Sequence, residues 1–214
     1  MEPAARHPFR TLWIGVVLLG LILILGAVIS RRHAAAIALP VLGVVQDFAL
    51  TNQLGQPVTL ADLQGKVWLA DIIFTRCPGP CPRMTRQMAE IQRSLAGKAP
   101  VRLVSLTTDP GYDSPVVLSN YARRFDADPQ RWQFLTGTKT AIAGLAIDSL
   151  KLTALEKSAA DRTSEEDLFI HSTIFVLVDK QGRLRGIFET SDADQEWAQV
   201  RPAILAAIRQ LERE

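Results

Sequence analysis

The chain has 214 residues and a formal net charge of +2, and its length suffices for one domain with a substantial core in addition to an anchoring segment. The first 33 residues contain four arginines and one glutamate, so the remaining residues carry a net charge of −1. A nearly neutral domain without a basic surface does not suit nucleic-acid binding, and we expect no DNA or RNA partner.

The N-terminal part contains a long uncharged run over residues 11–30, bounded by Arg10 and Arg31. As a helix this run would span about 30 Å, the thickness of a bilayer core. A cleaved signal peptide is the alternative, but its hydrophobic region is typically only about 7–15 residues long. We therefore predict a tail over 1–10, a retained transmembrane helix over 11–30 and a linker over 31–46. Arginines lie on both sides of the helix, so the charge does not indicate its orientation.

The domain expected over 47–214 begins with a β-hairpin, because 47–52 and 56–60 flank a Leu-Gly turn. The nearly continuous apolar run 67–74 follows. It predicts a central strand that is covered on both faces. This strand leads directly into the only two cysteines of the chain.

The later segments predict strands and helices in alternation. Helices are expected from Pro82 to about Gly97, from Pro115 to about Phe125, over 139–147 and from about Ala193 to Leu211, and strands over 101–106, 173–178 and 184–188. The last two strands would pair around a turn, and a charged stretch, 156–167, precedes them. The resulting βαβαββα order predicts an α/β, thioredoxin-like fold: a central mixed sheet flanked by helices, with the extra N-terminal hairpin.

Cys77 and Cys81 lie in the proline-rich loop Cys-Pro-Gly-Pro-Cys-Pro. The prolines disfavour helix before Pro82, so Cys81 is expected at the N-cap of the next helix. There the helix dipole would lower the pKa of its thiol. Three residues separate the cysteines, which permits either a disulfide or chelation of one ion by two thiolates. At this point copper binding, zinc binding and disulfide exchange all remain open.

His171 is the only histidine after residue 33, and it lies just before the strand 173–178. In a thioredoxin-like layout the loop before this strand lies beside the cysteine turn, and the imidazole would meet both sulfurs. Two sulfurs and one nitrogen suit Cu(I) or, with a further weak ligand, Cu(II), whereas zinc would need a fourth ligand. Without that layout, a lone histidine at a strand entrance is usually a surface residue. Asp109 and Asp113 are interpreted as a turn former and a helix cap.

The chain resembles the Sco/SenC family of membrane-anchored copper proteins. The resemblance is carried by residues 68–75 before the cysteines, 105–110 with 113–115, 132–137, and His171-Ser172 before an apolar strand. It implies a thioredoxin fold, copper held by Cys77, Cys81 and His171, and a domain outside the cytoplasm. The family commonly has Asp after the first Cys-Pro, where this chain has Gly79, and often Asp before the histidine, where this chain has Ile170.

The resemblance implies a copper metallochaperone held by one helix in the bacterial cytoplasmic (inner) membrane, with its domain facing the periplasm or the cell exterior. Its partner would be the cytochrome c oxidase subunit that carries the binuclear copper site, with another copper chaperone or a thiol reductase as further candidates. The alternative is a thiol–disulfide oxidoreductase that reduces cysteines of a copper site or of another extracytoplasmic partner. Cys77 and Cys81 would then be catalytic, so the residues leave open whether the protein is an enzyme. A peroxidase would need a dedicated peroxide pocket, and a purely structural domain would leave the dithiol without a role.

Overall fold

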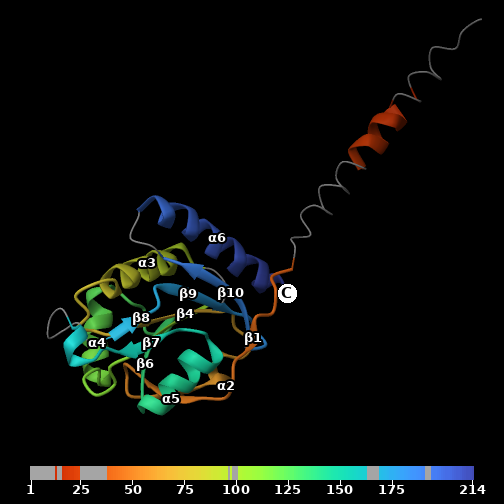
Figure 1. Ribbon diagram of the computed structural model, residues 1–214. Helices are drawn as coiled ribbons and strands as arrows, with labels where there is room; N and C mark the ends of the chain where they lie inside the picture. Colours follow the sequence, from red (N-terminus) through yellow and green to blue (C-terminus); the bar gives the residue numbers. More distant parts are fainter. Residues whose placement is uncertain are drawn as a thin grey trace, which may run out of the picture. The chain divides into compact units, whose positions relative to one another are not determined.

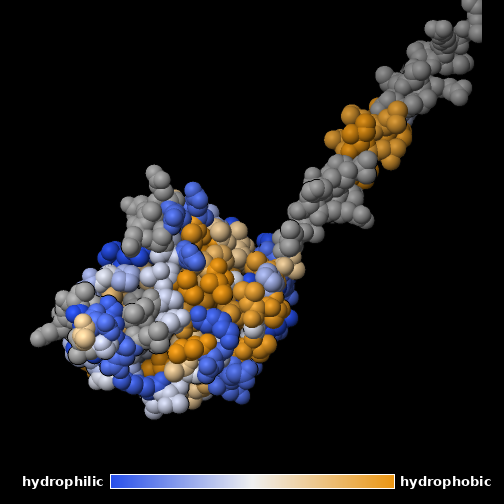
Figure 2. Space-filling model, viewed as in Figure 1, coloured by the Kyte–Doolittle hydropathy of each residue, from blue (hydrophilic) through white to orange (hydrophobic). Residues whose placement is uncertain are grey.

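The computed structural model describes residues 13, 16–24, 38–95, 97, 101–162, 169–190 and 194–214, and the chain divides into two units, Met1–Ala38 and Leu39–Glu214. In the first unit, residues 16–24 are helical, and their large apolar side chains are exposed and form a hydrophobic segment (Figure 2). No helix among these described residues combines the length and apolarity needed to cross a bilayer. The tail 1–10, residues 11, 12, 14, 15 and 25–30 of the predicted anchor, and 31–37 of the predicted linker lie outside the described residues.

The second unit contains a mixed sheet of eight strands in the order β1-β10-β9-β4-β5-β6-β2-β3. Its strands are β1 (Gly43–Val44), β2 (Ala49–Asn52), β3 (Pro57–Thr59), β4 (Trp68–Ile73), β5 (Arg102–Thr107), β6 (Trp132–Thr136), β9 (Ile174–Val178) and β10 (Arg183–Glu189). β4, β5 and β6 are parallel, whereas β9 is antiparallel to β4 and β10 is antiparallel to β9. A separate antiparallel pair is formed by β7 (Ala154–Glu156) and β8 (Phe169–His171).

Helices cover both faces of the sheet (Figure 1). They are α2 (Leu60–Leu63), α3 (Cys81–Ser94), α4 (Pro115–Arg124), α5 (Lys139–Ala143) and α6 (Asp194–Arg213). α5 continues as a π-helix over Gly144–Ser149, and a short 3-10 helix covers Ala159–Asp161. α3 and α6 lie on one side of the sheet, and α2 and α5 lie on the other (Figure 1). In β4, Leu69 and Ile73 join the core under α3 and α6, while Trp68 and Ile72 join the core under α2 and α5. This alternation explains why the whole strand is apolar and buried.

The predicted order of elements is confirmed in β4–α3–β5–α4–β9–β10–α6, which is the thioredoxin-like arrangement, and the hairpin is confirmed as β2 and β3. The residues 132–136 add a strand that the sequence analysis did not assign. β6 pairs with β5 on one side and with β2 on the other, and so attaches the hairpin to the sheet. The short strand β7 also precedes His171, and it overlaps the charged stretch 156–167 only at Glu156.

Residues 39–46, assigned to the linker from the sequence, belong to the compact second unit. Gly43 pairs with Leu184 in β10. The Leu42 N–H donates to the Leu184 carbonyl at 2.8 Å, and the Val45 N–H donates to the Gly182 carbonyl at 2.8 Å. The segment has no strong strand pattern of its own. It becomes a strand because the edge of β10 supplies its hydrogen bonds.

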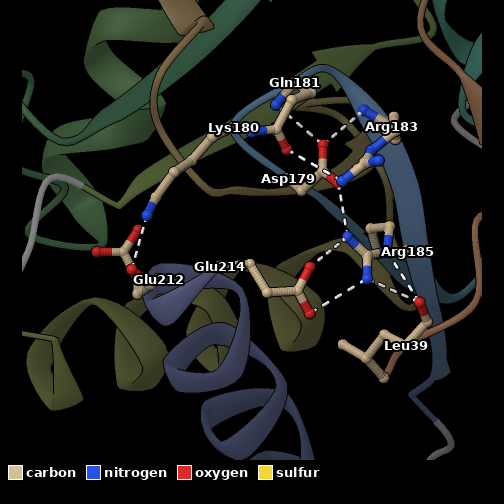
Figure 3. Close-up of polar contacts among 8 residues, drawn as sticks. All are labelled: Leu39, Asp179, Lys180, Gln181, Arg183, Arg185, Glu212 and Glu214. Carbon is tan, nitrogen blue, oxygen red and sulfur yellow. Dashed lines mark hydrogen bonds and ion pairs between the residues drawn. The ribbon is translucent and has the colours of Figure 1, made fainter. Parts of the chain in front are cut away.

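Arg185 in β10 joins the two ends of the second unit (Figure 3). Its side chain is 3% exposed and donates to the Leu39 carbonyl at 2.7 Å, to Asp179 at 2.7 Å and to Glu214 at 2.8 Å. Arg183 forms a second ion pair with Asp179 at 2.7 Å. Burial raises the pKa of Asp179, but hydrogen bonds from the Arg183 backbone and from both arginine side chains outweigh it and hold the pKa below its usual value.

We expect Arg185→Met to lower the free energy of unfolding by about 3 kcal/mol, because Asp179 would lose a buried charged partner. Since the folded pKa of Asp179 is lowered, its stabilising contribution is present above the unfolded pKa of about 3.9 and is lost as the pH falls. Urea unfolding at pH values from 6 to 3 measures both effects. The exposed Arg209→Met is the control. A wild-type-to-variant difference that stays constant with pH would contradict this account.

Candidate functional site

Cys77 and Cys81 lie where β4 leads into α3, at the carboxyl end of a central strand. Both are free thiols and both are buried, Cys77 being 8% exposed and Cys81 0% exposed. The two side chains are in hydrogen-bonding contact, and the Phe74 N–H donates to the Cys81 sulfur at 3.4 Å. The structure therefore brings together the two sulfurs that the sequence singled out, and Cys77 is the one nearer to solvent.

Cys81 is the first residue of α3 rather than its N-cap. Pro80 holds the N-cap position with helical φ and ψ of −73° and −24°, and its carbonyl accepts from the Met84 N–H at 3.0 Å. Burial raises the pKa of the Cys81 thiol, and the contact with Cys77 raises it further. The prediction of a lowered thiol pKa is therefore wrong for the metal-free protein, because the helix turns this sulfur into the core, where desolvation outweighs the helix dipole.

Asp113 is a buried carboxylate that holds the start of the cysteine loop, and the helix-cap interpretation is wrong. Its side chain, 0% exposed, accepts from the Thr75 N–H at 3.1 Å, from the Thr75 hydroxyl at 2.5 Å and from the Thr107 hydroxyl at 2.5 Å. The cap of α4 is Ser114, whose hydroxyl accepts from the Val117 N–H at 3.4 Å. Burial raises the pKa of Asp113, and the hydrogen bonds from the two threonines offset only part of that effect.

Arg76 ties the cysteine loop to the loop that follows β5. Its guanidinium pairs with the Asp109 carboxylate at 2.6 Å and lies 4.0 Å above the centre of the Tyr112 ring. The Asp109 backbone carbonyl also accepts from the N–H groups of Tyr112 and Asp113, so its predicted role as a turn former is confirmed. The ion pair adds a long-range contact that the local sequence does not indicate.

Asp71 is a further charged residue near the thiols. It lies in β4, six positions before Cys77, and is 0% exposed. Burial is the main cause of the raised pKa values of Cys81 and Tyr121, and the charge of Asp71 adds to both. In the sequence, Asp71 lies inside the apolar run 67–74, to which no function was assigned. A carboxylate inside a strand that is otherwise apolar was the signal that could have identified it.

His171 is the last residue of β8, and its backbone pairs with Ala154 of β7, so it lies in a strand rather than in a loop. The neighbouring Phe169 ring contacts the Phe74 ring edge-on, with 5.2 Å between the ring centres. β8 therefore passes close to the start of the cysteine loop. The imidazole lies outside the described part of the structure, and among the described side chains no three His, Cys, Asp or Glu residues cluster as a metal site. The meeting of His171 with both sulfurs stays a prediction.

The donor set next to the cysteines is dominated by sulfur. The nearby carboxylates of Asp113 and Asp109 are engaged by hydrogen bonds and an ion pair, and the buried Asp71 is one further carboxylate that acts electrostatically on Cys81. Hard cations prefer oxygen ligands, whereas a pair of thiolates selects soft ions such as Cu(I). Two adjacent thiols can also form a disulfide when their geometry allows it. The arrangement thus suits soft-metal binding and dithiol exchange.

Comparison with known proteins agrees with this geometry. The model of the family described as SCO1/SenC matches residues 40–205. The chain is 37% identical over 142 residues to the SCO1 protein homolog of Bacillus subtilis, which covers 65% of this chain and 70% of that protein. It is similar to copper-bound ScoI of Bradyrhizobium japonicum, with 25% identity, a TM-score of 0.64 and coverage of 78% of this chain and 99% of that one.

A second solved structure is that of BsSco, described as a member of the Sco family of cytochrome c oxidase assembly proteins in which a disulfide switch was identified. It is 30% identical to this chain, with a TM-score of 0.66, and the match covers 80% of this chain and 95% of that one. Both sulfur functions considered above, metal binding and disulfide formation, thus have a counterpart among similar proteins.

Proposed function

The chain belongs to the SCO1/SenC family, and from this premise we propose that it binds copper through Cys77, Cys81 and His171. It would then deliver the ion to the binuclear copper site of a cytochrome c oxidase during assembly. The observation that carries the proposal is the pair of buried free thiols in contact at the end of β4. The copper-bound ScoI structure and the role of the Sco family in oxidase assembly support it.

The position of β8 supports His171 as the third ligand. Phe169 contacts Phe74 at the start of the cysteine loop. His171 is two residues further along the same strand, so its backbone lies near that loop. Copper binding requires both thiols to lose their protons, and the charge of the ion offsets the burial that otherwise keeps Cys81 protonated. Release of the ion would follow by exchange of one ligand after another for those of the recipient.

We also propose that residues 11–30 anchor the protein in the bacterial cytoplasmic membrane, with the second unit in the periplasm or outside the cell. The absence of charge over these residues supports this location. So does the helical conformation of residues 16–24, whose large apolar side chains are exposed. A membrane-bound copper donor would share a compartment with an oxidase subunit that receives copper outside the cytoplasm.

The same thiols support a second function, the reduction of a disulfide in a partner, and the disulfide switch described for BsSco favours it. Cys77, the more exposed thiol, would attack one partner sulfur as a thiolate, forming a mixed disulfide and releasing the other partner sulfur as a thiolate. Cys81 would then attack the Cys77 sulfur and release the second partner thiolate. Two electrons pass to the partner, the two thiol protons leave with them, and a Cys77–Cys81 disulfide remains.

Copper titration of the full chain tests the role of His171. We expect the wild type to bind one copper ion, and His171→Ala to bind it at least about tenfold more weakly with a changed absorption spectrum, because one of three ligands is lost. His33→Ala, which removes a histidine outside the domain, is the matched control. Unchanged affinity and spectrum in His171→Ala would remove this residue from the site. A wild type without one-to-one binding would contradict the copper function itself.

A further inference from the structure

A mostly apolar cavity of about 160 Å³ lies beside the cysteine loop, between β4, α5 and the β7–β8 pair. Ile72, Ile142, Ala146 and Phe169 contribute apolar side chains to its lining. Lys139 and Glu156 also line it. Their side chains are 71% and 56% exposed and form an ion pair at 3.4 Å. An ion pair on the solvent side of an apolar cavity marks its mouth.

The cavity is large enough for one ring or one branched side chain but too small for a drug-sized ligand. Pockets for drug-sized ligands measure about 300–1,000 Å³, whereas an apolar cavity of about 150 Å³ accepts benzene. An occupant of this cavity therefore inserts one ring or branched chain and leaves the rest of the molecule outside. The part outside would meet the acidic side chain of Glu156 and two basic side chains, Lys139 and Arg162, which pair with it at 3.4 Å and 3.7 Å. A polypeptide offers both features, an apolar side chain and polar or charged groups on either side of it.

Two walls of the cavity are connected to the cysteine loop. Phe169 contacts Phe74, whose N–H donates to the Cys81 sulfur. On another side, Thr108 and Pro110 line the cavity. Asp109, between them, pairs with Arg76, which is next to Cys77. A polypeptide held in the cavity therefore lies next to residues that contact the cysteine loop.

We propose that this cavity is the anchor site for a partner polypeptide that docks over the cysteine loop. The partner inserts an aromatic or branched aliphatic side chain between α5 and β8, and charged residues of both signs flank that side chain to pair with Lys139 and Glu156. A buried apolar anchor surrounded by polar contacts is the usual source of affinity at protein interfaces. The identification of this partner as the copper recipient rests on the proposed function, whereas binding of the side chain does not.

The test uses two capped peptides, acetyl-Gly-Gly-Phe-Gly-Gly-amide and the same peptide with alanine in place of phenylalanine. They are titrated into the reduced, metal-free full chain in lipid nanodiscs, with the methyl groups of Ile72 and Ile142 observed by NMR. We expect saturable shifts with the phenylalanine peptide and at least tenfold weaker binding of the alanine peptide. Ala143→Leu fills the cavity and is expected to weaken binding of the phenylalanine peptide at least tenfold. Ala206→Leu, at an exposed alanine of α6, is expected to bind like the wild type.

Equal affinity for the two peptides, or unchanged binding by Ala143→Leu, would overturn the proposal. Ile147→Ser serves as a second variant, because Ile147 lines the cavity but is 43% exposed and tolerates substitution better. It is expected to weaken binding of the phenylalanine peptide severalfold.

Copper titration of Ala143→Leu separates the two proposals. Normal copper binding with loss of peptide binding supports the anchor site, whereas a wild type that binds the peptide but no copper contradicts the proposed function alone.

Discussion

Replacing Cys81 with serine is expected to lower the affinity for Cu(I) by about 100-fold or more, because a hydroxyl is a poor ligand for a soft ion. The variant retains Cys77 and His171 of the proposed ligand set. Competition against a Cu(I) chelator measures the loss. Cys81→Ala removes the sulfur without placing a hydroxyl in a site that is 0% exposed, and the same loss in both variants assigns the effect to the sulfur. Wild-type affinity in Cys81→Ser would exclude Cys81 as a ligand.

The same variant separates the copper function from disulfide reduction. Cys77 is 8% exposed and Cys81 is 0% exposed, so an attack on a partner disulfide should start from Cys77. Without Cys81 the second step is missing, and a mixed disulfide with an added disulfide substrate should accumulate. Mass spectrometry of the intact protein detects this adduct. Cys77→Ser should not accumulate this adduct, because the remaining thiol, that of Cys81, is 0% exposed. If neither variant traps an adduct while both lose copper, copper binding alone accounts for the thiol pair.

Asp113→Ala is expected to lower the free energy of unfolding by about 3 kcal/mol or more. The substitution leaves three donors without their acceptor, the Thr75 N–H and the hydroxyls of Thr75 and Thr107, and each such loss costs about 1–3 kcal/mol when the group stays buried. Urea unfolding measures the effect. Asp148→Ala, at an exposed position, is the control and should change stability by less than about 0.5 kcal/mol. Equal midpoints for the two variants would contradict the role of Asp113 in holding the cysteine loop.

The pH dependence of Asp113 has the opposite sign to that of Asp179. Burial raises the folded pKa of Asp113, so its contribution to stability is complete below the unfolded pKa of about 3.9 and is lost as the pH rises through the folded value. Asp113→Asn cannot titrate there. The difference in unfolding free energy between wild type and Asp113→Asn should therefore move in favour of the variant as the pH rises above about 4. A difference that does not depend on pH between 4 and 7 would show that the carboxylate titrates alike in both states.

Local pattern was enough to predict much of this protein. The run of apolar residues in β4, the helical spacing after Pro82 and the order of the remaining segments predicted the thioredoxin-like core. The apolar run that predicted β4 also placed Cys77 and Cys81 at the end of a central strand. These features depend on periodicity and on the chemistry of side chains close in sequence, which a linear sequence displays directly.

The tertiary structure decided which of these residues are buried and what they contact. The sequence suggested a capping role for Asp113 and an activated thiol for Cys81, but the fold buries both and raises both pKa values. It also turned residues 43–44 into a strand through the free edge of β10 and placed the cavity beside the cysteine loop. Desolvation and hydrogen bonds between residues distant in sequence act only after the chain has folded, so no local pattern could reveal them.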